Sequence, residues 1–155
     1  MLKIKVIAIG KIKDSSYKLL ISEYSKRLSP YSKIDIIELD AGSFKNDSQK
    51  EKVKKEEGEK FLKIIEKNMD SRIILLDEGG EVFNSVEFSE FLNYDTREVI
   101  FLIAGTLGFS EEVKSRVPKK FSLTRLTLPH EMARVILFEQ LFRAVTIETG
   151  KKYHY

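Results

Sequence analysis

The residues best suited to acid–base chemistry near neutral pH are two histidines near the end of the chain. His130 and His154 are the only histidines among the 155 residues. Imidazole can accept or donate a proton near neutrality, so either ring is a candidate for proton transfer. His154 lies in a charged, aromatic tail, Lys151-Lys-Tyr-His-Tyr155. Such a tail suits contacts with phosphates and bases, although a frayed terminus is the alternative interpretation.

A second polar group lies on the helix predicted over about 132–148. Glu139, Arg143 and Thr146 are four and three residues apart, which places them on one face of a helix. Two interpretations stay open: an ion pair that supports a crowded helix, or a contribution to a binding site. Most other residues of this segment are apolar, so we expect the helix to be buried on two sides.

Glycines and polar residues also follow three predicted strands, at Leu76-Asp-Glu-Gly-Gly80, Ala104-Gly-Thr-Leu-Gly108 and Thr124 to His130. Glycine lets the backbone approach a ligand closely. In an open parallel sheet, ligands bind outside the carboxyl ends of the strands. Each segment taken singly is typical of a plain turn, but their occurrence at three strand ends also favours a ligand pocket.

The elements that must position these residues alternate along the chain and indicate one α/β domain over residues 1–155. We predict strands at 2–9, 34–39, 73–76, 99–104 and 121–128, and helices at about 15–28, 48–67, 85–92 and 132–148, with a short helix capped by Ser110. Several strands are uniformly apolar, which is typical of a mostly parallel sheet with helices on both faces. We expect a turn at Asp77–Gly80, and we expect Pro129 to end the last strand at Leu128.

The composition narrows the class of protein. Cysteine is absent, which excludes disulfides and thiolate metal sites, and two histidines make a protein-built transition-metal site unexpected. No apolar run is long enough to span a membrane, and the first strand does not resemble a signal peptide, so we expect a cytoplasmic protein. A net charge of +3 mildly favours a polyanionic partner. The Lys- and Glu-rich helix at 48–67 interleaves both signs, which is more typical of a solvated face than of an RNA-binding stripe.

Several catalytic motifs are missing. The sequence contains neither a Gly-x-Gly-x-x-Gly dinucleotide motif after its first strand nor a Gly-Lys-Ser/Thr phosphate loop, and it lacks the Gly-x-Ser-x-Gly elbow of serine hydrolases. The segment Pro129-His130-Glu131 begins like a zinc protease helix, but Arg134 occupies the place of the second histidine. The familiar hydrolase and nucleotide-binding signatures therefore do not account for the three strand ends.

The C-terminal part of the sequence closely resembles one protein family. The matching segments are Leu126-Thr-Leu-Pro-His130, Arg134-Val-x-Leu-x-Glu-Gln-Leu-x-Arg143-Ala and Tyr153-His154, together with Ile7-Ala-Ile-Gly10 and Leu76-Asp77 near other strand ends. They resemble the SPOUT-class ribosomal RNA large subunit methyltransferase H family, whose members methylate N3 of a pseudouridine. The resemblance spans the whole chain.

The resemblance implies an α/β fold with a deep C-terminal trefoil knot, an obligate homodimer and S-adenosylmethionine as methyl donor. Carried over by position, the cofactor-binding residues are Leu76, Gly105, Thr124, Arg125, Leu126, Thr127, Leu128 and Pro129. On the same basis, His154, Tyr153 and Arg143 would hold the target nucleotide, and His130 would shape the pocket.

The chain departs from the family pattern in its glycine loop and in its tail. Ala104 stands where the family usually has glycine, Lys152 replaces a proline, and Tyr155 replaces a basic residue. The leading hypothesis is methylation of ribosomal RNA in assembled ribosomes. The alternatives are a non-catalytic RNA-binding or ribosome assembly module with the same fold, and a methyltransferase that acts on another RNA or on a protein.

Overall fold

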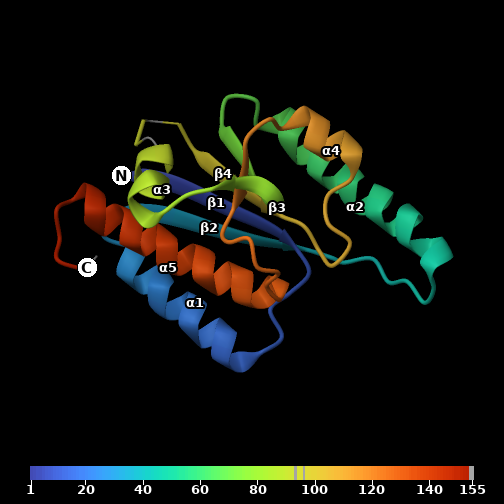
Figure 1. Ribbon diagram of the computed structural model, residues 1–155, viewed down its shortest axis with the longest axis horizontal. Helices are drawn as coiled ribbons and strands as arrows, with labels where there is room; N and C mark the ends of the chain where they lie inside the picture. Colours follow the sequence, from blue (N-terminus) through green and yellow to red (C-terminus); the bar gives the residue numbers. More distant parts are fainter. Residues whose placement is uncertain (93, 96, 154–155) are drawn as a thin grey trace.

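The computed structural model describes residues 1–92, 94–95 and 97–153 (Figure 1). Within these residues, five strands form one parallel sheet in the order β2-β1-β4-β3-β5. The strands are β1 (Leu2–Ile9), β2 (Ser32–Leu39), β3 (Arg72–Val82), β4 (Val99–Ile103) and β5 (Lys120–Ser122). The helices are α1 (Ser15–Leu28), α2 (Asp47–Lys67), α3 (Ser85–Leu92), α4 (Glu111–Arg116) and α5 (His130–Glu148). Each predicted helix lies within two residues of its expected bounds.

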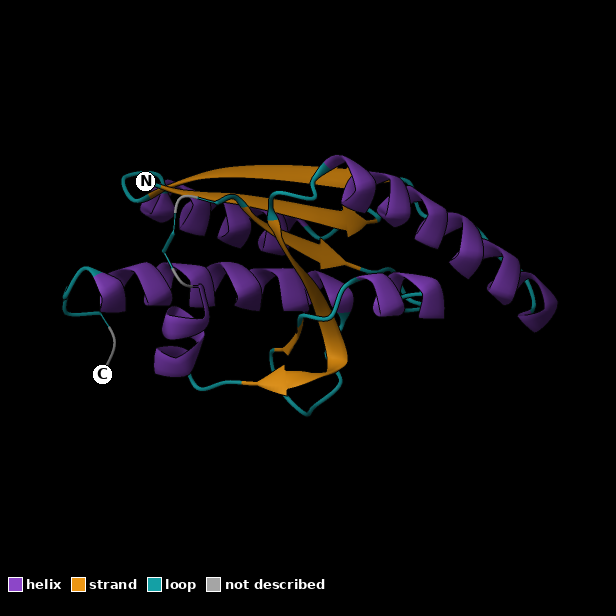
Figure 2. Ribbon diagram, turned by 90° about the horizontal axis from the view of Figure 1, so that it is seen from above, coloured by secondary structure: helices purple, strands orange, loops and turns teal. Residues whose placement is uncertain are grey.

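Alternating residues of the central strands fill an apolar cluster on each face of the sheet. On β4, Phe101 belongs to the cluster that α1, α3 and α5 complete. Its neighbours Ile100 and Leu102 belong to the cluster that α2 and α4 complete. Successive side chains of a strand point to opposite faces, so a uniformly apolar strand must be covered by other elements on both faces of the sheet. This confirms the predicted parallel sheet with helices on both faces, and Figure 2 shows these helical layers.

The third strand differs from the prediction. It does not end at Leu76 but continues through a register shift between Leu76 and Glu81, and Phe121 of β5 pairs with both of them. The predicted turn at 77–80 is therefore wrong, because these residues form an irregularity within a strand. Gly80 permits the close crossing: a Cβ there would lie 2.7 Å from backbone atoms of β5. The glycine pair is typical of a turn, but in this structure it allows the backbones of β3 and β5 to approach closely.

The last strand is also shorter than predicted. It ends at Ser122 and not at Leu128, because the Ser122 hydroxyl donates to the Thr124 carbonyl at 2.7 Å and the chain leaves the sheet. The residues from 123 to 129 form an irregular bend, after which α5 begins at His130 with Pro129 as its N-cap.

Helix α5 packs against both α1 and α3, which confirms that it is buried on two sides. Its buried side chains Leu137, Phe138 and Leu141 join the cluster on this face of the sheet. Figure 1 shows α5 beside α1 below the strands. In the described part of the chain, none of the helices combines the length and apolar character needed to cross a bilayer. The deep knot implied by the resemblance stays a prediction.

Candidate functional site

A pocket of about 480 Å³ lies at the edge of the sheet where the loops after β4 and β5 meet the irregular middle part of β3. Its walls are residues 76–78, 103–109, 122–124 and 126–130, with Ala133. Small-molecule sites occupy roughly 300–1,000 Å³, and this edge of a parallel sheet is where α/β proteins bind ligands. The structure thus brings together parts of the three segments that the sequence indicated, although the segment at 76–80 lies within β3 and does not follow it.

The loop after β4 presents backbone to the pocket. The Gly108 amide donates to the Gly105 carbonyl at 3.1 Å and closes a turn. Gly108 has a φ of +74°, which residues with a Cβ rarely adopt. Gly105 lies against β1, since a Cβ on it would be 3.0 Å from Cγ2 of Ile9. Ala104, which replaces the family glycine, also lines the pocket, and its methyl group packs toward the cluster on the α2 face.

The bend after β5 is organised by Thr124. Its carbonyl accepts the Ser122 hydroxyl, and its Oγ1 accepts the Leu126 amide at 3.1 Å. Such side-chain bonds replace the strand ladder that the backbone has left. Leu126 is 72% exposed, so the rim of the pocket carries a large uncovered apolar side chain. Arg125 is exposed and does not line the pocket.

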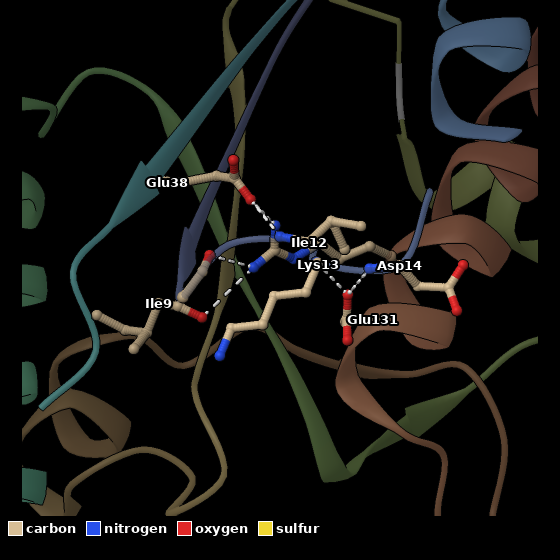
Figure 3. A network of polar contacts seen from close by, with 8 residues as sticks. Ile9, Ile12, Lys13, Asp14, Glu38 and Glu131 are labelled. Carbon is tan, nitrogen blue, oxygen red and sulfur yellow. Dashed lines mark hydrogen bonds and ion pairs between the residues drawn. The ribbon is translucent and has the colours of Figure 1, made fainter. Parts of the chain in front are cut away.

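The first turn of α5 closes the pocket with His130, which is half-buried. The next residue, Glu131, joins this turn to the loop after β1. Its Oε1 accepts the backbone amides of Lys13 at 2.6 Å and Asp14 at 3.2 Å (Figure 3). These hydrogen bonds lower the pKa of Glu131 because they stabilise its ionised form, and the bond from Lys13 has the larger effect.

A second polar group lies at the other end of α5. Arg143 donates from Nη2 to Glu139 Oε1 at 2.6 Å, and its guanidinium lies 4.9 Å from the centre of the Tyr153 ring. The Tyr153 hydroxyl donates to the same Glu139 oxygen at 3.3 Å. Glu139 raises the pKa of Arg143, and burial raises the pKa of Tyr153. The predicted ion pair is confirmed, and the tail as far as Tyr153 folds back onto the helix.

The predicted site residues therefore fall into two groups. Seven cofactor positions, all except Arg125, line one pocket together with His130. Arg143 lies about 20 Å from His130 along α5, at about 1.5 Å per residue, and Tyr153 accompanies it. His154 lies outside the described residues. Within one chain, Arg143 and Tyr153 do not line the pocket.

Sequence reasoning missed one polar pair near the start of α5. Arg134 pairs with Glu38 of β2 at 2.6 Å, and its side chain is only 3% exposed. The sequence interpretation used Arg134 as the residue that breaks a zinc motif and as part of a segment matching the family, and gave it no partner. The available signal was a lone arginine early in a helix predicted to be buried, because a buried charge needs a partner. Among the described residues, no group of three or more potential metal ligands occurs.

A ligand-sized pocket outside the carboxyl ends of a parallel sheet covered on both faces defines an α/β ligand-binding protein. The family model described as "Predicted SPOUT methyltransferase" matches residues 2–154. The chain belongs to the SPOUT methyltransferase family, as the C-terminal motifs indicated, and is thus an enzyme whose family uses S-adenosylmethionine as methyl donor.

Two relatives and one solved structure illustrate the match. A protein of Kosmotoga olearia is 40% identical and covers 99% of this chain and 100% of its own length. A protein of Clostridium botulinum (strain Okra / Type B1) is 42% identical, with 99% of each chain covered. Both are named Ribosomal RNA large subunit methyltransferase H. A solved structure concerned with 2-OH methylation on tRNA shares the fold, with a TM-score of 0.54 at 12% identity over 97% of this chain and 99% of its own.

Proposed function

We propose that this chain transfers a methyl group from S-adenosylmethionine to N3 of a pseudouridine in large-subunit ribosomal RNA, on assembled ribosomes. The observation that carries the proposal is the identity of about 40% over the full length of proteins named Ribosomal RNA large subunit methyltransferase H. The position of the target base and the assembled ribosome as substrate follow from the resemblance described above. The net charge of +3 is compatible with a polyanionic partner.

The size and lining of the pocket are compatible with S-adenosylmethionine. Leu76 and Leu128 offer apolar walls to an adenine ring, and the turn closed by Gly105 and Gly108 offers backbone polar groups. Asp77 adds a carboxylate to the wall, which favours a cationic ligand. When bound, the donor supplies a methyl group that is already activated on a positively charged sulfur.

The chain's own residues must align the acceptor base and assist the loss of its N3 proton. We assign His130 to shaping the pocket, because it lines the wall at the start of α5. We assign His154, Tyr153 and Arg143 to holding the target nucleotide. We propose that one of the two imidazoles assists the loss of the N3 proton.

The distance between the pocket and the Arg143–Tyr153 group supports a homodimer. Arg143 and Tyr153 lie about 20 Å along α5 from the pocket of their own chain, so we propose that the tail of one chain completes the pocket of its partner. Half-buried apolar residues such as Met132 and Val135 on α5 are suited to such a contact. In this proposal the chain is a single domain and works as a homodimer in the cytoplasm.

The direct test incubates the protein with labelled S-adenosylmethionine and ribosomes that lack the modification. We expect label in the large-subunit RNA. Calorimetry with the donor separates the alternatives, because a non-catalytic RNA-binding module predicts no saturable donor binding. Donor binding without label in the RNA would overturn the assigned substrate.

Removing the tail tests the shared site. A chain that lacks 153–155 should bind the donor nearly as well as the full chain, since the pocket residues are all retained. It should lose methyl transfer, because Tyr153 and His154, two of the three residues assigned to the nucleotide, are gone. Replacing Lys151 with alanine, which leaves 153–155 intact, is the matched control. Retained transfer by the shortened chain would remove the tail from the mechanism.

A further inference from the structure

Arg134 is a buried cation on the first turns of α5 and directly follows the pocket residue Ala133. Its side chain is 3% exposed, whereas that of its partner Glu38 is 32% exposed. Nη1 donates to Glu38 Oε2 at 2.6 Å. Nη2 donates to the carbonyls of Gly10 at 2.6 Å and Ile9 at 3.4 Å. Its Nε is also buried and has no hydrogen-bond partner within the described ranges.

The partners of Arg134 all lie at the carboxyl ends of β1 and β2. Glu38 is the penultimate residue of β2, and its Oε2 also accepts the Ile12 amide at 2.9 Å. Ile9 ends β1, and Gly10 follows it. Figure 3 shows Ile9, Ile12 and Glu38 close together at these strand ends, with Glu131 beside Lys13 and Asp14 of the same loop. One side chain of α5 therefore ties together the ends of two strands.

These contacts connect two walls of the pocket. On one side, Ala133 directly precedes Arg134 and lines the pocket with His130. On the other side, Gly105 lines the pocket and lies against the side chain of Ile9. The bond from Arg134 to the end of β1 thus fixes the first turn of α5, and the bend before it, relative to the turn after β4.

We propose that Arg134 is a positioning residue for methyl transfer: it sets the width of the donor pocket by joining the start of α5 to the Ile9–Gly10 backbone beneath Gly105. The inference rests on the proposed function, since it takes the pocket to hold S-adenosylmethionine. Arg134 does not line the pocket and acts through Ala133, His130 and Gly105.

The chemistry of the side chain supports a geometric role over a purely stabilising one. A buried ion pair is a weak source of net stability, because desolvation of the two charges offsets their attraction. A guanidinium, however, is planar and directs its donors in a fixed fork, so it can hold a carboxylate and a carbonyl in one arrangement. An ammonium group donates from a single point and cannot reproduce that arrangement.

The experiment compares Arg134 with a second buried arginine. Arg72, at the start of β3, donates from Nη2 to the Phe91 carbonyl at 2.7 Å and from Nη1 to the Leu92 carbonyl. It lies at the opposite ends of the strands from the pocket. Arg134→Met and Arg72→Met each remove a buried guanidinium bonded to carbonyls. Donor affinity is measured by calorimetry with S-adenosylmethionine, at a temperature at which circular dichroism shows every variant folded.

We expect Arg134→Met to weaken donor binding while Arg72→Met binds as the unaltered chain does. In metal sites, loss of a residue that orients a ligand typically costs about 10- to 100-fold in affinity or activity, and we expect a loss of about tenfold here. Arg134→Lys should recover only part of it. Should Arg134→Met fail to fold, Arg134→Lys and Glu38→Gln supply the same comparison, with weaker donor binding expected in both.

Two negative results have different meanings. Equal donor affinity in the Arg134 and Arg72 variants, with a normal value for the unaltered chain, would overturn the positioning role and leave the proposed function standing. Absence of donor binding by the unaltered chain would overturn the proposed function, and this inference with it.

Discussion

Replacement of Gly80 by alanine should disrupt the contact between β3 and β5. A Cβ at this position would lie 2.7 Å from three backbone atoms of Lys120 and Phe121. Carbon atoms in ordinary contact are about 3.5–4.0 Å apart, so the methyl group is roughly 1 Å too close to atoms that cannot rotate away. Because β5 leads directly into the bend at 123–129, any shift of β5 also moves a wall of the pocket.

The size of the effect follows from this overlap. Overpacking typically costs about 1–3 kcal/mol, and we expect the upper part of that range because backbone must move. For a chain of this length, about 3 kcal/mol corresponds to a fall in Tm of roughly 6–12 °C. Donor affinity should fall as well, since Thr124 and its neighbours line the pocket.

Gly79→Ala is the matched control. The nearest atom to its added Cβ is Asp77 Oδ2 at 3.2 Å, the far end of a flexible side chain. Alanine also restricts the unfolded chain, which contributes about 0.4–1 kcal/mol where the backbone is compatible. Thermal and urea unfolding of the two variants test the account. If Gly80→Ala unfolds within about 1 kcal/mol of Gly79→Ala, the crossing is not as close as described, since overpacking alone costs more.

Two further predictions concern the loops around the pocket. Gly108→Ala should lower the free energy of unfolding by about 1 kcal/mol, because φ is +74° there; thermal unfolding measures it, and an unchanged Tm would contradict the left-handed conformation. Glu131→Gln should destabilise the chain at neutral pH but not in acid. The folded pKa of Glu131 is lowered by the amides of Lys13 and Asp14, so its contribution is present above the ordinary pKa of about 4.3 and is lost as the pH falls through the lowered value. Urea unfolding of both chains at neutral pH and near pH 3 tests this, and an equal difference at the two pH values would refute it.

Much of the fold could be predicted because its signals are local. Uniformly apolar strands such as β4 indicated a parallel sheet covered on both faces. The nearly apolar segment of α5 indicated a helix buried on two sides. Glycines at 105 and 108 and the bend before Pro129 placed two loops at one sheet edge, and the pocket lies there.

What could not be predicted depends on contacts between distant segments. The Gly79-Gly80 pair is locally indistinguishable from a turn, and only the position of β5 shows that it is a strand crossing. Arg134 and Glu38 are 96 residues apart, so no local pattern relates them. The separation of Arg143 from His130, by contrast, follows from the predicted helix at about 1.5 Å per residue.

The measurement that tests the central claim most directly is mass mapping of ribosomal RNA after incubation with the protein and S-adenosylmethionine. Free large-subunit RNA and assembled ribosomes, both lacking the modification, serve as parallel substrates. The proposed function predicts one added methyl group on a pseudouridine, with assembled ribosomes as the better substrate. A methyl group on a different nucleotide, or none in either RNA under conditions in which the donor binds, would contradict it.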